Sequence, residues 1–534
     1  MPKLIINDWT GGLAPNYWRG RQLTKVGADN QYAGGVVNPL RNVGFLSPAS
    51  KTFTALTNIG QLASTTPVLR FVGSDDGLLV AGGFQTIYFA QSTKLHAVRT
   101  DTDTIQIAGG SPSFPHTVGS VLRDIIVYQL NGLPALCYAY STEMGALSNL
   151  LSSPTFDDVV LSTSTGGAVL SSTFDVILEV ADNNFLYIAN GNAIHKFDGT
   201  SAGGTAGTET QSVIDLGVNW MVVDMRDGAG YLWIAAVNSL KSTISGLFDV
   251  NAQRKVAIYV WNKLSSSLTF TDVIPVVGAN TVHSLFFVNG IPHCITSSFE
   301  GVVQLRRYTG RDFEVIREVG NNSGTTDARP ANRHAVVPFS NGVLWQAQNG
   351  RIYWYGRIAD GIEPGLYILG ESDAASFTSA GAIFVKNADT LYVSYVDGST
   401  NKVSTYLPNS ASGATTSTGN YFSKVYELPK LSRITGLTVY YPKLSSGANA
   451  NMTMSVYTNF STTAANASDL QVNYQDVPTG DGSRGYKYFP LGGEDFEAVN
   501  AIQIGIDWAT GQTIAASVRP SRVEIEYEPT DRKK

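Results

Sequence analysis

The 534-residue sequence has few charges and no long apolar run, and each shortage excludes a class of protein. Charged residues make up only 15% of the chain, and its net charge is −6, without a basic stripe. A protein that grips nucleic acid through phosphates needs clustered Lys and Arg, so we expect DNA to pass this surface without specific binding. No segment approaches the roughly 20 apolar residues of a transmembrane helix, so we expect no membrane span.

The sequence also has only two cysteines and no recognisable secretion signal. The two cysteines, Cys137 and Cys294, fall in different predicted strand units, which seldom bring Cα atoms within the ~7 Å that a disulfide requires. We therefore expect two buried, reduced thiols. The opening segment MPKLIINDWTGG has no basic stretch followed by an apolar core and a small-residue cleavage site, so we expect no secretory signal.

Residue patterns of catalytic and metal sites are missing from the sequence as well. None of the six histidines lies at H-E-x-x-H or H-x-x-x-H spacing, and phosphate-binding and nucleophile-elbow motifs do not occur. A glycosidase needs converging carboxylates, and the candidates are Asp75, Asp76, Asp224, Asp227 and Asp389. Because Asp next to Gly is ordinary turn chemistry, we interpret these acids as turn residues. We expect no enzyme activity, no cofactor and no metal.

What the chain has in abundance is short β-forming runs that meet at tight, Gly-containing turns. One copy is NFLYIANGNAIHKFDG, in which Leu186, Ile188 and Ile194 flank the turn at Asn190-Gly191. Asn-Gly between β-formers is the strongest short-range hairpin signal, because a type I′ turn needs positive φ at both central residues. A second copy is SNGVLWQAQNGRIYWYGR.

The spacing of these hairpins indicates the fold class. Equivalent points recur about every 45 to 60 residues, about seven times, which is near the period of four-stranded propeller blades. We therefore predict an all-β chain with a β-propeller of about seven blades over 51–408. An irregular multi-sheet β protein and a β-solenoid are the alternatives, although solenoid coils repeat at a much shorter period. The lead-in LRNVGFLSPASKTFTALTN is expected to close the ring, and TEMGALSNLLSS is the one helix candidate.

The N-terminal segment 1–50 differs from the repeat and reads as an extended Gly/Pro-rich arm. Its large side chains Trp9, Tyr17, Trp18 and Arg19 cannot be buried within such an arm. Aromatic and Arg side chains dominate the energetics of interfaces, so we interpret these four as assembly contacts. An arm that covers its own propeller is the alternative.

The C-terminal part is a second β region. Residues 409–420, NSASGATTSTGN, form a small polar linker. Residues 421–534 alternate apolar and polar positions, as in ITGLTVYYP, where Leu437, Val439 and Tyr441 share one face. Strict period-two alternation is typical of half-buried antiparallel strands, so we predict a jelly-roll-like β-sandwich.

The plan of arm, propeller and C-terminal sandwich resembles that of structural tail proteins of tailed bacteriophages. It is most similar to the tail hub or nozzle proteins of short-tailed phages, on the segments IINDWTGGLAPN, NPLRNVGFLSPAS, GNAIHKFDG and NGRIYWYG. The resemblance implies a non-enzymatic virion protein, assembled in the host cytoplasm into a homo-oligomeric ring, a hexamer in that plan. It also implies portal, adaptor or other tail subunits as partners, and a place in the DNA exit channel used for genome ejection.

A carbohydrate-binding or glycan-cleaving surface protein built on a propeller is the alternative function. Exposed Trp and Tyr rings would have to cluster on one loop face to stack on sugars. Trp233, Trp345 and Trp354 instead lie within predicted strands, where a core role is expected. An outer decoration or receptor-binding subunit of the virion is the third hypothesis.

Overall fold

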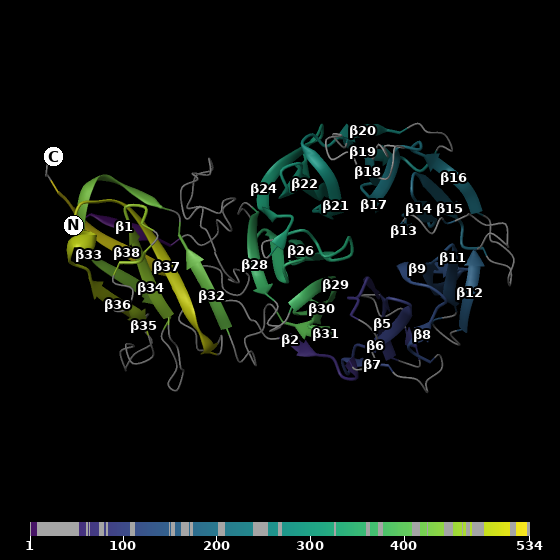
Figure 1. The fold of residues 1–534 in the computed structure, drawn as a ribbon, viewed down its shortest axis with the longest axis horizontal. Helices are drawn as coiled ribbons and strands as arrows, with labels where there is room; N and C mark the ends of the chain where they lie inside the picture. The colour runs from purple at the N-terminus through teal and green to yellow at the C-terminus, as the bar shows by residue number, and fades with distance from the viewer. Residues whose placement is uncertain are drawn as a thin grey trace.

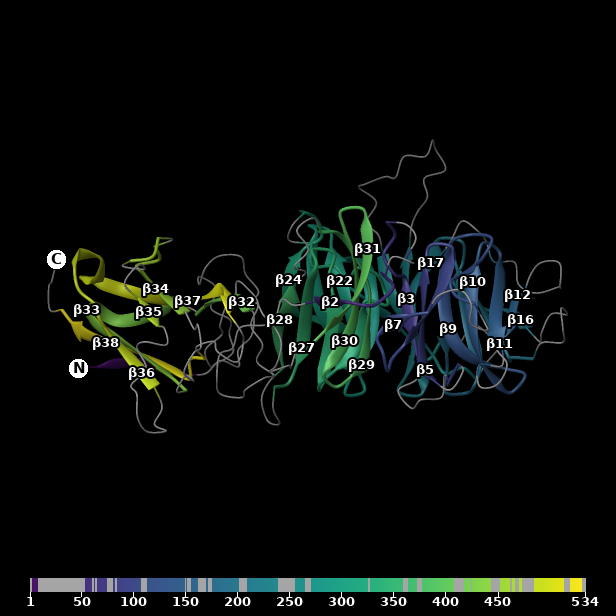
Figure 2. The ribbon, with the colours of Figure 1, turned by 90° about the horizontal axis from the view of Figure 1, so that it is seen from below.

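The computed structural model describes residues 2–7 and most of 53–530. The residues outside this description are 1, 8–52, 60–61, 63–64, 74–79, 82–83, 107–112, 149, 151–154, 162–169, 171–174, 201–208, 239–254, 265–269, 325–326, 359–363, 372–376, 408–416, 424, 443–451, 462, 466–469, 473–484, 513–518 and 531–534. The described chain forms a ring of seven sheets and one further, curled sheet beside it (Figure 1). Seen at right angles, the ring is a flat disc (Figure 2).

The first three blades of the ring follow one another in sequence (Figure 1), and the first strand of each contacts the first strand of the next. Blade 1 contains β3 (Arg70–Val72), β5 (Phe84–Gln91), β6 (Lys94–Arg99) and β7 (Thr104–Ile105), with β4 (Val80–Ala81) and β8 (His116–Thr117) paired to β5 and β6. Blade 2 contains β9 (Leu122–Leu130), β10 (Leu133–Tyr140), β11 (Glu143–Ser148) and β12 (Thr155–Leu161). Blade 3 contains β13 (Val176–Val180), β14 (Leu186–Asn190), β15 (Ala193–Phe197) and β16 (Glu209–Asp215).

Blades 4 to 6 repeat this order of four antiparallel strands. Blade 4 contains β17 (Trp220–Gly228), β18 (Tyr231–Asn238), β19 (Lys255–Trp261) and β20 (Asp272–Pro275). Blade 5 contains β21 (Ala279–Val288), β22 (Ile291–Ser298), β23 (Val302–Tyr308) and β24 (Phe313–Asn321). Blade 6 contains β25 (Val336–Phe339), β26 (Gly342–Gln346), β27 (Arg351–Gly356) and β28 (Gly365–Glu371).

Blade 7 closes the ring with strands from both ends of the repeat. It contains β29 (Phe377–Asn387), β30 (Thr390–Asp397), β31 (Thr400–Tyr406) and β2 (Phe53–Ala55). Strand β2, which precedes the first blade in the sequence, supplies the outermost position of blade 7 and pairs antiparallel with β31. The ring of Phe53 stacks on Tyr406 at a centroid distance of 4.9 Å. The predicted closing strand is confirmed.

The hub and the seams between blades show that the ring is complete. Each innermost strand contacts the innermost strands of both neighbouring blades, from β3 through β9, β13, β17, β21, β25 and β29 back to β3. Seven apolar clusters fill the seven seams, one between each pair of adjacent blades. The all-β class and the propeller of about seven blades are thus confirmed.

Tight turns between the two innermost strands of a blade explain why the repeat is visible in the sequence. Asn131 and Gly132 have φ values of 52° and 76°, and Asn289 and Gly290 have 50° and 75°. Positive φ at both central residues is the signature of the type I′ hairpin. These two Asn-Gly pairs therefore specify their reversals locally. The turn predicted at Asn190-Gly191 is displaced by one residue, because Asn190 is the last residue of β14 and pairs with Ala193, which leaves Gly191 and Asn192 as the turn.

One expectation inside blade 2 is wrong. The leucine-spaced segment TEMGALSNLLSS, the helix candidate, contains strand β11, whose residues pair with β10 on one side and β12 on the other. Tertiary pairing overrides a weak local helical preference here. Cys137 in β10 and Cys294 in β22 are buried and free, as predicted.

The C-terminal β region is one curled sheet of eight strands, where the sequence predicted a jelly-roll-like sandwich of two sheets. Its strands are β1 (Lys3–Ile6), β32 (Ser417–Phe422), β33 (Tyr426–Tyr441), β34 (Met452–Thr458), β35 (Gln471–Val472), β36 (Gly485–Pro490), β37 (Val499–Gln512) and β38 (Arg522–Pro529), with one 3-10 turn, η6 (Glu494–Phe496). The long strand β33 pairs with β37 near its start and with β38 and β36 further along, so hydrogen bonding continues where two sheets would separate. The predicted inward residues Leu437, Val439 and Tyr441 are fully buried in its core.

Strand β1 belongs to this sheet although it lies at the other end of the chain. Lys3–Ile6 pairs antiparallel with β38 at the edge of the sheet, and the N-terminal end lies beside the curled sheet in Figure 1. This strand lies within the segment 1–50 that was expected to form an arm. The assembly-contact candidates Trp9, Tyr17, Trp18 and Arg19 are outside the described residues.

Candidate functional site at the propeller hub

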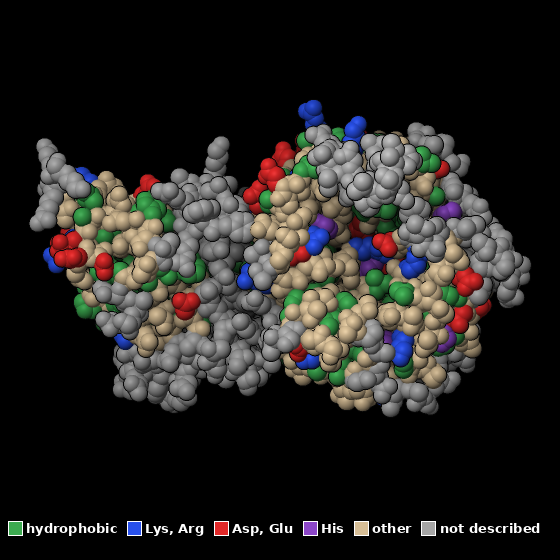
Figure 3. Space-filling model, viewed as in Figure 1, with side chains coloured by type: hydrophobic (Ala, Val, Ile, Leu, Met, Phe, Trp, Pro, Cys, Tyr) green, Lys and Arg blue, Asp and Glu red, His purple; other side chains and the backbone are tan. Residues whose placement is uncertain are grey.

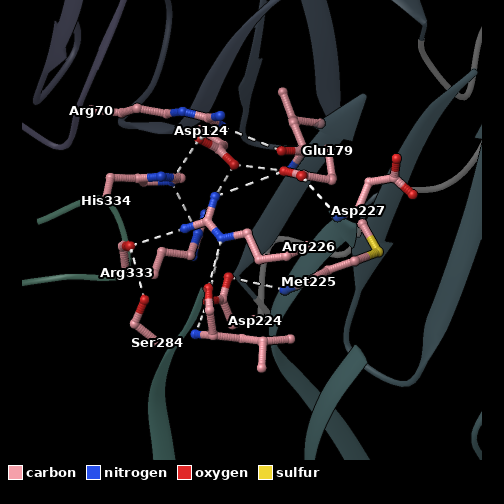
Figure 4. A network of polar contacts seen from close by, with 12 residues as sticks. Arg70, Asp124, Glu179, Asp224, Met225, Arg226, Asp227, Ser284, Arg333 and His334 are labelled. Carbon is pink, nitrogen blue, oxygen red and sulfur yellow. Dashed lines mark hydrogen bonds and ion pairs between the residues drawn. The ribbon is translucent and has the colours of Figure 1, made fainter. Parts of the chain in front are cut away.

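The largest group of buried, charged side chains lies at the centre of the ring. Figure 3 shows basic, acidic and histidine side chains together within the central hollow, and Figure 4 shows their contacts from close by. The group combines side chains from the innermost strands of blades 1 to 5 with a segment that precedes β25 of blade 6. Its members are Arg70, Asp124, Glu179, Asp224, Arg226, Asp227, Ser284, Arg333 and His334.

Asp124 is the centre of the first half of this hub network. Its carboxylate is fully buried and accepts the N–H of Ile125 at 2.8 Å, within its own blade. It also accepts the N–H of Leu178 on the neighbouring blade 3 at 2.8 Å, and Nη1 of Arg70 on blade 1 donates to it at 3.0 Å. One carboxylate therefore joins three blades.

Arg333 and His334 reach Asp124 from the far side of the ring. Nη2 of Arg333 lies 3.2 Å from Oδ2 of Asp124 and donates to the carbonyl oxygen of Val176 at 2.6 Å. Nε2 of His334 lies 3.0 Å from Oδ1 of Asp124 and 3.1 Å from Nε of Arg333, so it can serve one of these two partners at a time. Residues before blade 6 thus span the hub to blades 2 and 3.

Asp224 repeats the arrangement of Asp124 two blades further around the ring. Its carboxylate accepts the N–H of Met225 at 2.9 Å and the N–H of Leu285, on blade 5, at 2.7 Å. Each of the two acids follows an extra, bulged residue on its innermost strand, Arg123 in one case and Val223 in the other. A bulge re-aims the following side chain, here toward the next blade.

Ser284 follows a bulge of the same kind on the innermost strand of blade 5. Its hydroxyl lies 3.4 Å from the carbonyl oxygen of Arg333. The same carbonyl accepts Nη2 of Arg226 at 3.0 Å, while Nε of Arg226 donates to the carbonyl of Leu285 at 3.1 Å. The second half of the network is therefore tied to the first through the segment before blade 6.

Glu179 and Asp227 extend the network to the seam between blades 3 and 4. Oε1 of Glu179 accepts the N–H of Asp227 at 3.0 Å, and Oε2 lies 3.7 Å from Nη1 of Arg226. The Asp227 carboxylate accepts Nζ of Lys263 at 2.7 Å and the N–H of Asp182 at 2.8 Å. Like Asp124, Glu179 and Asp227 thus contact both backbone amides and cationic side chains.

The pKa values of the hub acids differ because their cationic neighbours differ. Burial alone would raise the pKa of Asp124, but the charges of Arg70 and Arg333 and the hydrogen bond with His334 together hold it well below its usual value. Burial raises the pKa of both Glu179 and Asp224, and Arg226 offsets only part of that effect. Burial and the nearby Arg70 hold the pKa of His334 well below its usual value, so the ring is neutral at pH 7.

A perturbed acid in a central hollow is the pattern of a catalytic site, but ion-pair networks perturb pKa values too. Asp124, Glu179 and Asp224 each accept at least one backbone N–H from an adjacent blade or strand. A carboxylate whose lone pairs serve fixed amides is a poor general base or nucleophile, because a substrate has to displace those bonds. The arrangement is therefore suited to holding blades in register.

The sequence-based candidates have mixed outcomes. Asp224 and Asp227, interpreted as turn residues, lie within strand β17 at the hub, so that interpretation is wrong for both. Asp389 is an exposed turn residue whose N–H is accepted by Oδ1 of Asn387, in agreement with the turn interpretation. Asp75 and Asp76 lie outside the described residues.

Sequence reasoning missed the other members of the hub network, which are Arg70, Asp124, Glu179, Arg226, Ser284, Arg333 and His334. The available signal was an acid inside an otherwise apolar strand run, as in RDIIVYQL for Asp124. Within the described ranges, no group of three or more His, Cys, Asp or Glu side chains is arranged to hold a metal ion. In the same ranges, no helix has the length and apolar character needed to cross a bilayer.

Comparisons with known proteins concern the fold. No protein-family model matches the chain, and no curated protein matches its sequence. The chain is similar to the crystal structure of the RRP9 WD40 repeats, with a TM-score of 0.41, 9% identity, and 68% of this chain and 99% of that chain covered. The structure of the Dos1 propeller gives a TM-score of 0.39 and 11% identity, covering 67% and 95%. The crystal structure of BBS1N in complex with ARL6DN gives a TM-score of 0.40 and 14% sequence identity. That comparison covers 69% of this chain and 98% of the BBS1N chain.

Proposed function

We propose that this protein is a non-enzymatic scaffold whose propeller is a rigid structural body. The observation that supports this most is the use of the hub acids. Asp124 and Asp224 occupy the position where a propeller enzyme would place its carboxylates, yet each bridges two adjacent blades through backbone amides. A site that is filled by such cross-blade bonds stabilises the ring and leaves no free acid pair for catalysis in the described network.

We further propose that the scaffold is a phage tail hub or nozzle subunit that forms part of the DNA exit channel. Support comes from the resemblance in plan noted for the sequence and from a mildly acidic chain of low charge, which suits a conduit because a basic wall would retain the duplex. Arg333 and His334 span the propeller axis, so a lumen wide enough for DNA has to be formed between several copies. Portal, adaptor or other tail proteins are the partners in this proposal.

The test is to assemble phage particles with and without this protein. We expect particles that lack the protein to leak DNA or to have no complete tail. An added copy of the gene should restore DNA retention and tail assembly. Labelling the protein and imaging the particles should place it in a ring beneath the portal vertex. Intact, infective particles without the protein would rule the role out.

A glycan-binding function is the second proposal, and one feature of the curled sheet favours it. Tyr486 and Tyr488 are 56% and 45% exposed and, two residues apart on β36, share a face. The ring of Tyr440 on the paired strand lies 6.1 Å from that of Tyr486. Exposed tyrosine rings in a row offer apolar faces to sugars, whereas Trp345 and Trp354 are fully buried.

A glycan array separates the two proposals. We expect Tyr486→Ala to abolish binding of a glycan found on the array. The control is Val218→Ala, at an exposed apolar site elsewhere, which should keep that binding. An array without any binding glycan contradicts it.

A further inference from the structure

Strand β1 is held by a part of the chain that lies far from it in sequence. Lys3 and Glu524, which are in contact, are separated by 521 positions. The four residues of β1 pair with β38 in the register Lys3↔Glu526, Leu4↔Ile525, Ile5↔Glu524 and Ile6↔Val523. Ile6 is buried in the core of the sheet, and Leu4 lies against that core. The strand therefore completes a sheet that is otherwise built from residues beyond 416.

The contact between β1 and β38 is specific in charge. Nζ of Lys3 lies 3.0 Å from Oε2 of Glu524 and 3.0 Å from Oε1 of Glu526. Glu524 is buried, and the hydroxyl of Tyr440 lies 3.3 Å from its carboxylate. A buried acid needs a cationic partner, and Lys3 and Arg522 provide this charge. The β38 edge is thus a slot that accepts a strand with a basic first residue.

The contacts of β1 are the same whichever copy of the chain supplies the strand. The backbone bonds and ion pairs that the described residues of β1 form are made with β38, and the carbonyl of Pro2 accepts the N–H of Tyr527 at 3.2 Å. Residues 8–52 connect β1 to β2 of the propeller. A connection of about 45 residues can extend to ~150 Å, far enough to reach an adjacent copy.

We propose that β1 of one copy occupies the β38 edge of a neighbouring copy, so that the subunits exchange their N-terminal strands. The inference rests on the proposed self-assembly of the scaffold and names the contact that links its subunits. Exchange of an identical element needs no new interface chemistry, because the β38 slot and the incoming strand are already complementary. Once copies are held in a ring, the neighbouring slot is present at high effective concentration.

The first test uses the unaltered protein. Unlabelled and 15N-labelled chains are mixed in equal amounts before assembly, and a carbodiimide then condenses the Lys3 amine with the Glu526 carboxylate to an amide with loss of water. Proteolytic peptide pairs with one heavy and one light member arise only between copies. We expect about half of all Lys3–Glu526 links to be mixed, as random exchange requires.

The second test traps the same contact with a disulfide. The pair formed by Lys3 and Glu526 is of the non-hydrogen-bonded type, because the adjacent pair is bonded from the Tyr527 N–H to the Pro2 carbonyl. Such pairs have Cα atoms about 4.5 Å apart, which suits a disulfide. We expect the K3C/E526C double variant to give a ladder of linked chains on a non-reducing denaturing gel. Either single variant is the control and should give no ladder of this kind.

The outcomes separate the inference from the function on which it rests. If the protein assembles and every Lys3–Glu526 link joins residues of one chain, strand exchange is wrong while the scaffold proposal stands. If the protein stays monomeric at the concentrations used for assembly, both are wrong. Mixed isotope pairs in the assembled protein establish the exchange without any substitution that could disturb folding.

Discussion

Replacing Asp124 with asparagine removes one negative charge from the hub and keeps the shape of the side chain. Arg70 and Arg333 then face a neutral amide, at contacts that are now 3.0 and 3.2 Å. The new NH2 group must also point at a donor, because the carboxylate oxygens accept the N–H groups of Ile125 and Leu178. The substitution therefore leaves Arg70 and Arg333 without an anionic partner. It also places the asparagine NH2 group next to a backbone N–H group, so that two hydrogen-bond donors face each other.

Breaking a buried ion pair by removing one partner costs about 3–5 kcal/mol. We expect a loss of this size in the free energy of unfolding of Asp124→Asn. The matched control is Asp224→Asn, whose new NH2 group likewise replaces one of two oxygens that accept backbone N–H groups. The nearest arginine nitrogen to Asp224, however, is 3.7 Å away. Burial raises the pKa of Asp224, so its ionised form is disfavoured in the folded state and neutralising it should cost less, about 1–2 kcal/mol for weakened hydrogen bonds.

The assay is guanidinium unfolding, followed by the fluorescence of the buried propeller tryptophans, among them Trp345 and Trp354, at pH 7 and at several lower pH values. In the unfolded chain the pKa of an Asp side chain is about 4. In the folded protein the pKa of Asp124 lies well below that value. The contribution of its charge is therefore fully present above pH ~4 and is lost as the pH falls through the depressed folded pKa. The gap between wild type and Asp124→Asn should stay constant from pH 7 to 5 and narrow only below pH ~4.

Two results would refute this reasoning. A cost of less than about 1 kcal/mol for Asp124→Asn would mean that the cross-blade contacts do not hold the hub together. Equal costs for Asp124→Asn and Asp224→Asn would mean that the cations around Asp124 add nothing to its amide bonds.

Three further predictions address other parts of the molecule. Phe53→Ala should lower the free energy of unfolding by about 2–3 kcal/mol in thermal or chemical unfolding, because it removes the ring that anchors the closing strand, whereas exposed Thr54→Ala should change it little. Gly356→Ala should cost about 1–3 kcal/mol in the same measurement, since its Cβ would lie 2.5 Å from the indole two residues earlier. Burial raises the pKa of both Cys137 and Cys294 to about 12, so neither should react with a thiol reagent in the native protein at pH 8, and both should react after unfolding.

The propeller could be predicted from the sequence because its turns are specified locally. Asn131-Gly132 and Asn289-Gly290 are visible as residue pairs, and the structure gives them the positive φ values that the pattern requires. The seam residues were visible only as apolar runs, since a strand buried on both faces loses the alternation of a half-buried one. Blade number followed from the period, without knowledge of any contact between blades.

The hub and the curled sheet could not be predicted because they depend on contacts between distant residues. Asp124 bonds to Leu178, and the segment at Arg333 reaches across the ring, so neither partner lies within a local window. The polar–apolar alternation of β33 identifies a half-buried strand but is the same in a sandwich and in one curled sheet. The role of Lys3 depends on Glu524, at the opposite end of the chain.

Closure of blade 7 by β2 has a consequence for synthesis on the ribosome. Thr54 and Thr405, whose strands pair in the finished ring, are 351 positions apart. At translation rates of roughly 5–20 residues per second, β2 emerges about 20–70 s before its partner strand exists. Throughout that interval the nascent chain is an open arc with an apolar seam exposed at its growing end. Chaperone binding to ribosome-bound chains should therefore persist until β31 has left the exit tunnel and cease soon afterwards.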